Sequence, residues 1–187
     1  MLIGAPGSGK STLARQLARQ TGWPLLALDR VWHAMDYSVA AKQRFIAEQM
    51  QFMATHRDWL IDGNFTSTVP LRLAQANLVV WLRVPSLVAP VRLMRRSLSF
   101  HRNPATRPDM APGFQEHLDR DYLDFLTYAL TFRRAVEPRL AALLATVPAQ
   151  TDIRIIQSAS GKSALIGELT ELTRRGLNPT KGEGRGH

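Results

Sequence analysis

One stretch near the start of the chain decides its fold: Gly4-Ala5-Pro6-Gly7-Ser8-Gly9-Lys10-Ser11. It satisfies the pattern G-x-x-x-x-G-K-[ST], in which the glycines let the backbone curl so that successive N–H groups face one anion. An apolar segment, residues 1–3, precedes it, and a segment with Leu13 and Leu17 at helical spacing follows it. A strand, a glycine-rich turn and a helix in this order predict a phosphate-binding loop beside the positive end of a helix dipole.

The loop and the first helical residues are therefore the expected nucleotide-binding residues: Gly4, Ala5, Pro6, Gly7, Ser8, Gly9, Lys10, Ser11 and Thr12. Lys10 offers a mobile ammonium to the β- and γ-phosphates, and Ser11 offers a hydroxyl to Mg²⁺. ATP and Mg²⁺ are the expected cofactors. A second Gly-Lys-Ser at 161–163 has Ile156 where the pattern needs glycine. We interpret it as a loop and helix start whose turn, 158–161, could border a bound base.

Apolar runs alternate with helical periodicity along the rest of the chain. The predicted strands are 1–3, 25–28, 59–61, 78–84 and 153–156. The predicted helices are 10–21, 38–56, 86–100, a long helix with apolar positions from 118 to 136 that Pro138 should kink or split, and 162–172. This alternation predicts an α/β fold with a parallel sheet covered on both faces. The first strand is short for a central one, which usually has about 5 to 6 residues, so either the chain starts upstream or this strand is clipped.

Two of these strands run into an aspartate, Asp29 after 25–28 and Asp62 after 59–61. A carboxylate at the carboxyl end of a parallel strand lies at the edge where ligands bind. Mg²⁺ takes hard oxygen ligands, and a hydroxyl acceptor needs a carboxylate to orient it or to take its proton. The two aspartates can divide these tasks, and capping or turn formation is the alternative for each.

Positive charge is concentrated in two segments. Between positions 83 and 107 there are six arginines and no acidic residue, and together with the basic tail from 174 they account for the net charge of +9. The predicted helix and the proline-rich loop after it carry Arg92, Arg95, Arg96, Arg102 and Arg107. Guanidinium groups suit the charge on phosphate oxygens. The segment of about 92–115 is therefore predicted to be a lid that closes on a triphosphate, with a solvated basic face as the alternative.

Composition limits the remaining classes. The chain has 187 residues, 45% hydrophobic and 21% charged, and no cysteine, which excludes disulfides, iron–sulfur clusters and thiolate chemistry. No charged-then-apolar leader and no apolar run of 18 residues is evident, so a cytoplasmic protein with no membrane partner is expected. We expect one domain over 1–172 and a basic, disordered tail over 173–187.

Four segments together resemble the adenylate-kinase-like P-loop kinases and, within them, the DNA topology modulation (FlaR-like) proteins. They are residues 4–11, Leu28-Asp29, Trp59-Leu60-Ile61-Asp62-Gly63-Asn64-Phe65 and Arg107-Pro108-Asp109-Met110-Ala111-Pro112-Gly113. The resemblance runs from 1 to about 172. It implies the P-loop NTPase fold, a three-layer α/β/α structure with a five-stranded parallel sheet in the order 2-3-1-4-5. It also implies an ATP site at the loop, an acceptor site near Asp29 and Asp62, and an arginine-bearing lid.

One departure concerns the acceptor. Asp62-Gly63 is similar to the Asp-Gly pair of nucleoside monophosphate kinases, but their next residues, Phe-Pro-Arg, are replaced here by Asn64-Phe65-Thr66. The arginine that grips the acceptor's phosphate in those kinases is missing from this place. Arg30 or Arg72 could substitute for it.

The leading hypothesis is Mg-dependent transfer of the γ-phosphoryl group of ATP to an unidentified small-molecule or nucleotide acceptor. In it Lys10 and the loop hold the phosphates, Ser11 and Asp62 hold the metal, and Asp29 orients the acceptor. Developing charge is neutralised by Arg92, Arg95, Arg96 or Arg102. One alternative is a nucleotide-responsive, topology-modulating regulatory protein with little turnover and weak, nonspecific nucleic-acid binding. The other is a nucleoside monophosphate (adenylate) kinase. The preference for ATP over GTP and the oligomeric state are open.

Overall fold

In the computed structural model, residues 1–83 and 120–177 are described. They form one parallel sheet of five strands in the order β2-β3-β1-β4-β5. The strands are β1 (Leu2–Gly4), β2 (Leu25–Ala27), β3 (Leu60–Asp62), β4 (Leu78–Leu82) and β5 (Asp152–Ile156). The short strand β1 lies at the centre, with Leu2 opposite Asp62 of β3 on one side and opposite Val80 of β4 on the other.

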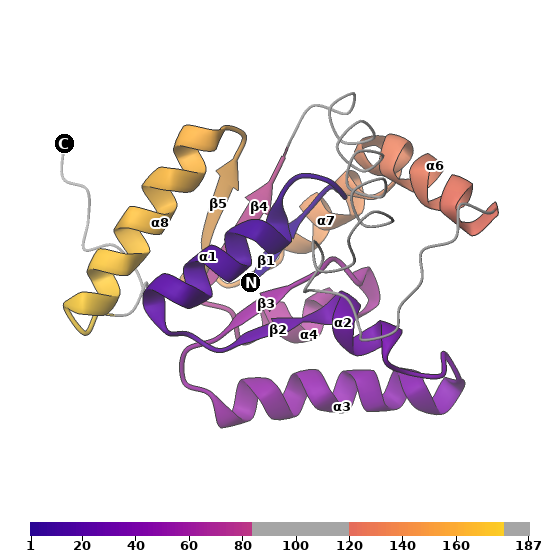
Figure 1. Ribbon diagram of the computed structural model, residues 1–187, viewed down its shortest axis with the longest axis horizontal. Coiled ribbons are helices and arrows are strands. Elements are labelled where there is room, and N and C mark those ends of the chain that lie inside the picture. The colour runs from indigo at the N-terminus through magenta and orange to yellow at the C-terminus, as the bar shows by residue number, and fades with distance from the viewer. Residues whose placement is uncertain (84–119, 178–187) are drawn as a thin grey trace, which may run out of the picture.

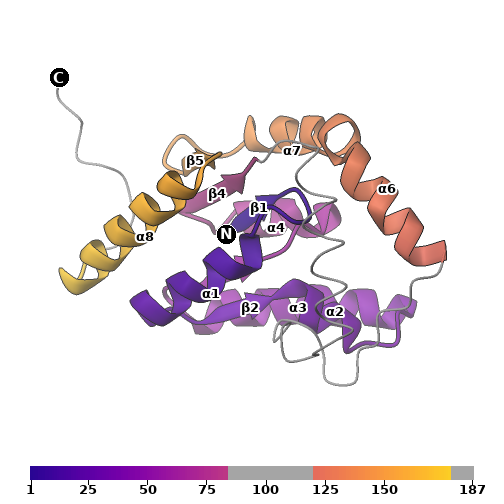
Figure 2. The same cartoon turned by 45° about the horizontal axis from the view of Figure 1, so that its top comes forward.

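Alternating residues of the central strands face opposite layers of helices. On one face, Leu2, Val80 and Leu82 pack with α1 (Lys10–Thr21) and α8 (Ala159–Arg174). Figures 1 and 2 show these two helices side by side across the same side of the sheet. Their leucines, Leu13 and Leu17 of α1 and Leu165 and Leu169 of α8, are 2% exposed or less. The sheet is therefore packed firmly against α1, the helix that begins at the end of the phosphate loop.

On the opposite face, Ile3, Val79 and Trp81 pack with a second layer. This layer contains α4 (Val69–Leu73), α6 (Arg120–Ala135) and α7 (Glu137–Leu144). A third apolar cluster joins β3 to α2 (Leu28–His33) and α3 (Val39–Thr55). The three layers α/β/α and the strand order are those implied by the resemblance.

The long predicted helix is split, as expected from Pro138. The helix α6 ends at Ala135 and α7 begins at Glu137. Glu137 is 5% exposed and accepts two hydrogen bonds from Arg83, at 2.9 and 3.1 Å, and the Arg83 guanidinium also lies 5.1 Å from the Trp81 ring. Because Glu137 lies in the first turn of its helix, the helix dipole also favours its charge. This pair fixes α7 to the end of β4.

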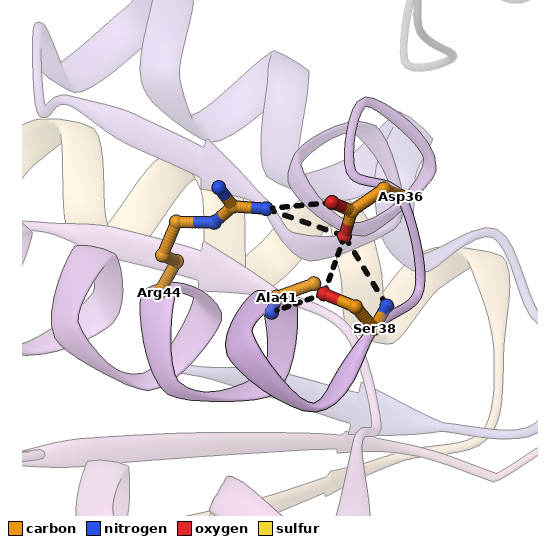
Figure 3. A network of polar contacts seen from close by, with 4 residues as sticks. All are labelled: Asp36, Ser38, Ala41 and Arg44. Atoms are coloured by element: carbon orange, nitrogen blue, oxygen red, sulfur yellow. Dashed lines mark hydrogen bonds and ion pairs between the residues drawn. The ribbon is translucent and has the colours of Figure 1, made fainter.

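The junction between α2 and α3 is held by a small polar network (Figure 3). The Ser38 hydroxyl accepts a hydrogen bond from the Ala41 N–H at 3.0 Å and so caps α3. Asp36 accepts hydrogen bonds from the Ser38 hydroxyl, 2.8 Å, and from Arg44, 3.2 Å. The Ser38 and Arg44 contacts lower the pKa of Asp36, but this carboxyl is fully exposed, so the network orients the junction without a buried charge.

Several boundaries differ from the sequence prediction. Leu28 begins α2 instead of ending β2, so Asp29 lies in the first turn of a helix and not at a strand end. The helix α8 begins at Ala159, three residues before the predicted start, because Ser158 caps it by accepting from the Gly161 N–H at 3.0 Å. The short helices at 66–68 and 69–73 had no predicted counterpart.

Within the part of the chain that the structure describes, no helix is both long and apolar enough to span a bilayer. The predicted helix 86–100, the lid of about 92–115 and most of the predicted tail lie outside the described residues, so the expected domain limits stay predictions.

Candidate functional site

The phosphate loop has the curled backbone that the motif predicts. The Ser8 N–H donates to the Ala5 carbonyl at 3.2 Å, with Pro6 and Gly7 between them. Gly7 has φ 72°, so this is a Pro-Gly turn in which glycine supplies the left-handed conformation. Gly9, at φ 88°, then caps α1. The Lys10 ammonium folds back onto the Ala5 carbonyl at 3.0 Å, across the mouth of the loop.

The first loop glycine is clamped between two neighbours. The side-chain amide of Asn64 accepts from the Gly4 N–H at 3.0 Å and donates to the Gly4 carbonyl at 2.9 Å. It thereby continues the hydrogen bonding of β1 one step beyond the last backbone contact, in which Gly63 N–H donates to Leu2. On the other side, a Cβ on Gly4 would lie 2.1 Å from the Leu82 carbonyl oxygen. Only glycine fits there, and Asn64 fixes where the loop begins.

Arg72 stabilises the turn after β3 that carries Asn64. Its guanidinium donates to the Gly63 carbonyl at 2.8 Å and to the Asn64 carbonyl at 2.6 Å. The side chain is fully buried, and burial lowers the pKa of the guanidinium to about 10, an effect that the nearby Asp62 opposes. Arg72 is therefore bound to the backbone of the turn after β3. The expectation that it could grip an acceptor phosphate is wrong, because its donors point at buried carbonyls.

Asp62 and Ser11, the predicted metal ligands, line one cavity of about 440 Å³. Asp62 ends β3 and is 5% exposed, and Ser11 lies in the first turn of α1. Both are hard oxygen donors of the kind that Mg²⁺ prefers, and both face the space beside the loop. The residues at this point fit the ion.

The same cavity carries two arginines. Arg15 of α1 and Arg30 of α2 line it, together with Glu48 of α3 and apolar residues of β2 and α2. Arg30 thus lies where the sequence analysis allowed an acceptor-binding arginine. Arg15 was not predicted. Two guanidinium groups and two carboxylates thus line the same cavity and can bind groups that are anionic or donate hydrogen bonds.

Asp29 lies elsewhere on the cleft. Its side chain is exposed and is not among the residues that line the cavity. It lies near Tyr128 of α6, whose pKa is raised, mainly by burial and further by the Asp29 charge. The Asn64 side chain, which holds Gly4, acts on the same pKa in the opposite direction, so Asp29, Tyr128 and Asn64 lie near one another.

The predicted lid residues Arg92, Arg95, Arg96, Arg102 and Arg107 lie outside the described residues, and their roles stay predictions. Sequence reasoning missed Asn64, Tyr128 and Lys162 as parts of the site. Asn64 belongs to the segment 59–65 that carries the resemblance, but no role was predicted for it, and Tyr128 belonged to no predicted motif. Lys162 did carry one, the second Gly-Lys-Ser, but its side chain reaches the phosphate loop, donating to Ser8 at 2.6 Å, rather than only marking a helix start.

Similarity to known proteins was found for a family model, a curated protein and a solved structure. The family model described as isopentenyl transferase matches residues 1–92. The chain is 28% identical over 124 residues to an adenylate dimethylallyltransferase from Allorhizobium ampelinum, covering 66% of this chain and 51% of that protein. This chain therefore spans about half the length of that curated relative. A gluconokinase structure from Sinorhizobium meliloti 1021 covers 93% of this chain and 90% of its own, with 12% identity and a TM-score of 0.39.

The sheet order, the three layers and the phosphate loop after β1 define the class of this protein: it has the P-loop NTPase fold with the strand order 2-3-1-4-5.

Proposed function

We propose that this chain is a P-loop transferase that takes the γ-phosphoryl group from Mg·ATP and passes it to an anionic acceptor bound in the cavity. The observation that carries this proposal is the arrangement of Ser11 and Asp62. Both line the cavity next to the loop that Lys10 closes. A donor on the loop and an acceptor in the cavity would therefore meet at these two residues.

The chain's own residues then have separate tasks. Loop N–H groups, the α1 dipole and Lys10 hold the phosphates, and Lys10 leaves the Ala5 carbonyl to do so. Ser11 and Asp62 would hold Mg²⁺, which supplies charge neutralisation between the β- and γ-phosphates when bound. Arg15 and Arg30 orient the acceptor's anionic group, and closing the cleft excludes water.

The reaction balances as an in-line displacement. The acceptor hydroxyl oxygen forms a bond to the γ-phosphorus while the bond from that phosphorus to the β–γ bridging oxygen breaks, and ADP leaves. A carboxylate takes the acceptor proton. Asp29 lies outside the cavity lining, so its proposed task of taking this proton and orienting the hydroxyl requires the acceptor to extend from the cavity toward it. Developing charge is proposed to be neutralised by Arg92, Arg95, Arg96 or Arg102.

A second candidate is favoured by the isopentenyl transferase match over 1–92. The same loop could hold the diphosphate of an isoprenyl donor, and a nucleotide in the cavity would accept the prenyl group with release of diphosphate. A nucleoside monophosphate kinase and a topology-modulating regulatory protein with little turnover stay alternatives to the first proposal, and membership of the FlaR-like branch stays a prediction. The arginine-rich segment 83–107 supports, as an accessory property, weak and salt-sensitive binding of nucleic acid.

One assay separates these candidates. Purified protein is incubated with Mg·ATP and, in parallel, AMP, CMP, UMP, dTMP and sugar or hydroxy-acid acceptors, and ADP release is followed. A parallel series supplies dimethylallyl diphosphate with AMP or ADP and follows diphosphate. ADP release that depends on one acceptor supports the kinase. Diphosphate release without ADP formation supports prenyl transfer and overturns the kinase, and neither product in any series overturns both.

A further inference from the structure

The second Gly-Lys-Ser of the chain brings Lys162 against the phosphate loop, although 154 residues separate them. The Lys162 ammonium donates to the Ser8 carbonyl at 2.6 Å. A Cβ built on Gly9 would lie 2.9 Å from the same nitrogen, so Lys162 also covers the outer side of Gly9. One side chain of the last helix thus touches the two residues at which the loop turns into α1.

This placement runs against the local electrostatics of α8. Lys162 lies in the first turn of that helix, where the dipole disfavours a cation. Its ammonium also adds to the positive charge that Lys10 and the α1 dipole already bring to the loop. A surface lysine in this position would turn toward water. A short, charge-assisted hydrogen bond to a loop carbonyl instead draws it inward.

The bond has a geometric consequence for the loop. In a trans peptide the C=O and the N–H point to opposite sides of one plane. Holding the Ser8 oxygen toward the Lys162 side chain of α8 therefore turns the Gly9 N–H away from that side chain. Glycine at position 9 adopts the left-handed φ without strain, and its missing side chain leaves space for the Lys162 nitrogen.

We infer that Lys162 is a positioning residue that holds the Ser8–Gly9 peptide in its phosphate-binding orientation and so raises the affinity of the loop for polyphosphate. The expected gain in polyphosphate affinity rests on the proposed function. The geometry itself, one peptide held by one side chain, can be tested without any nucleotide.

The first measurement uses the free protein. The chain has 12 glycines, so selective ¹⁵N-glycine labelling gives a small set of amide signals. In Lys162→Met the Gly9 signal should shift and its amide exchange with solvent should accelerate, while the Gly22 signal at the other end of α1 stays in place. Lys162→Arg keeps a charged donor and should leave Gly9 close to the wild-type signal. A Gly9 signal unchanged in Lys162→Met overturns the inference and leaves the proposed function as it was.

The second measurement uses calorimetry with Mg·ATP and, separately, with inorganic tripolyphosphate. Lys162→Met should weaken both by about tenfold, as expected for one lost charge-assisted hydrogen bond. Lys42→Met, which removes an exposed lysine of α3, is the matched control and should bind as wild type.

Loss of affinity for ATP but not for tripolyphosphate would overturn the inference in favour of a contact with the base. If Lys42→Met weakened polyphosphate binding equally, the effect of Lys162 would be one of general charge, and the inference would also be overturned. Absence of binding by the wild type overturns the proposed function, and with it the benefit assigned to Lys162, whatever the glycine spectrum shows.

Discussion

The phosphate loop and the cavity beside it meet at Ser11, but the loop is built from main chain and the cavity from side chains. The loop is main chain, held at Gly4 by Asn64, at Ala5 by Lys10 and at Ser8 by Lys162. The cavity is lined by charged side chains on three helices, and Arg30 and Glu48 among them are exposed. A backbone site tolerates little change, whereas a side-chain site can change its ligand by substitution. Under the proposed function, substitution should therefore change acceptor specificity more readily than binding of the phosphate donor.

The largest effect is expected where the loop leaves the sheet. Gly4→Ala places a Cβ 2.1 Å from the Leu82 carbonyl oxygen at a φ of 138°, so either β1 or β4 must move. We expect a loss of about 4 kcal/mol or more in the free energy of unfolding, measured by urea titration. Gly167→Ala in α8 has open space around it and is the control, which should be neutral or slightly stabilising. Equal stability of the two variants would contradict the close packing of β1 on β4.

The second effect is a pH dependence of stability from the start of β1. The Met1 ammonium donates to the Leu78 carbonyl at 2.7 Å, and burial, with a smaller contribution from Arg72, lowers its pKa from 8.0 to about 5. Between these values the unfolded chain binds more protons than the folded chain, so stability should rise with pH. The full rise is at most about 4 kcal/mol, present above pH 8 and lost toward pH 5.

Urea titrations between pH 5 and 8.5 measure this rise. Acetylation of the amino group removes the charge, and the acetylated protein should lose this part of the slope. Asp36→Asn is a further control, because the Asp36 carboxyl is fully exposed and should contribute little to the dependence. The same slope with and without acetylation would assign the dependence to other groups.

Removal of the Arg72 guanidinium should come next. Arg72→Met leaves the Gly63 and Asn64 carbonyls without their donor inside the protein, for an expected loss of about 3 kcal/mol. The matched control is Arg44→Met, because Arg44 is 60% exposed in its pair with Asp36 (Figure 3) and should cost less than about 0.5 kcal/mol. Similar losses in both variants would show that burial does not distinguish the two arginines.

The smallest change in stability is expected in the cavity. Arg30→Ala should raise the acceptor KM about tenfold with little change in the KM for ATP or in the unfolding free energy, because the side chain is exposed and lines the cavity that is proposed to bind the acceptor. Arg19→Ala, an exposed arginine near the end of α1, is the control. If Arg30→Ala changed only the KM for ATP, the cavity would bind the donor and not the acceptor, which would contradict this prediction.

The same difference explains what the sequence could predict. The loop motif and the apolar periodicity are local, so the loop 4–11, the helix 10–21 and a parallel sheet could be predicted from them, whereas the strand order was implied only by the family resemblance. The contacts of Asn64 and Lys162 with the loop could not be predicted, because they join residues that are 60 and 154 positions apart in the chain, respectively. Asp29 was predicted at a strand end, but Leu28 is drawn into the apolar cluster with Phe45 and Ile61 and starts a helix instead. Arg72 was predicted as a possible anion ligand because the burial of its side chain depends on tertiary contacts, which the sequence alone does not show.

The most direct test of the central claim is calorimetric titration of the wild-type protein and of Lys10→Ala with Mg·ATP and Mg·GTP. The account predicts a Kd between about 1 µM and 1 mM for the wild type with at least one of the two. In Lys10→Ala the affinity should fall by at least about a hundredfold and phosphoryl transfer should be lost, with an unfolding midpoint close to that of the wild type, because the Lys10 ammonium binds a carbonyl of the loop and lies outside the apolar clusters of the core. No heat from either nucleotide at millimolar concentration, or an unchanged rate in Lys10→Ala, would contradict it.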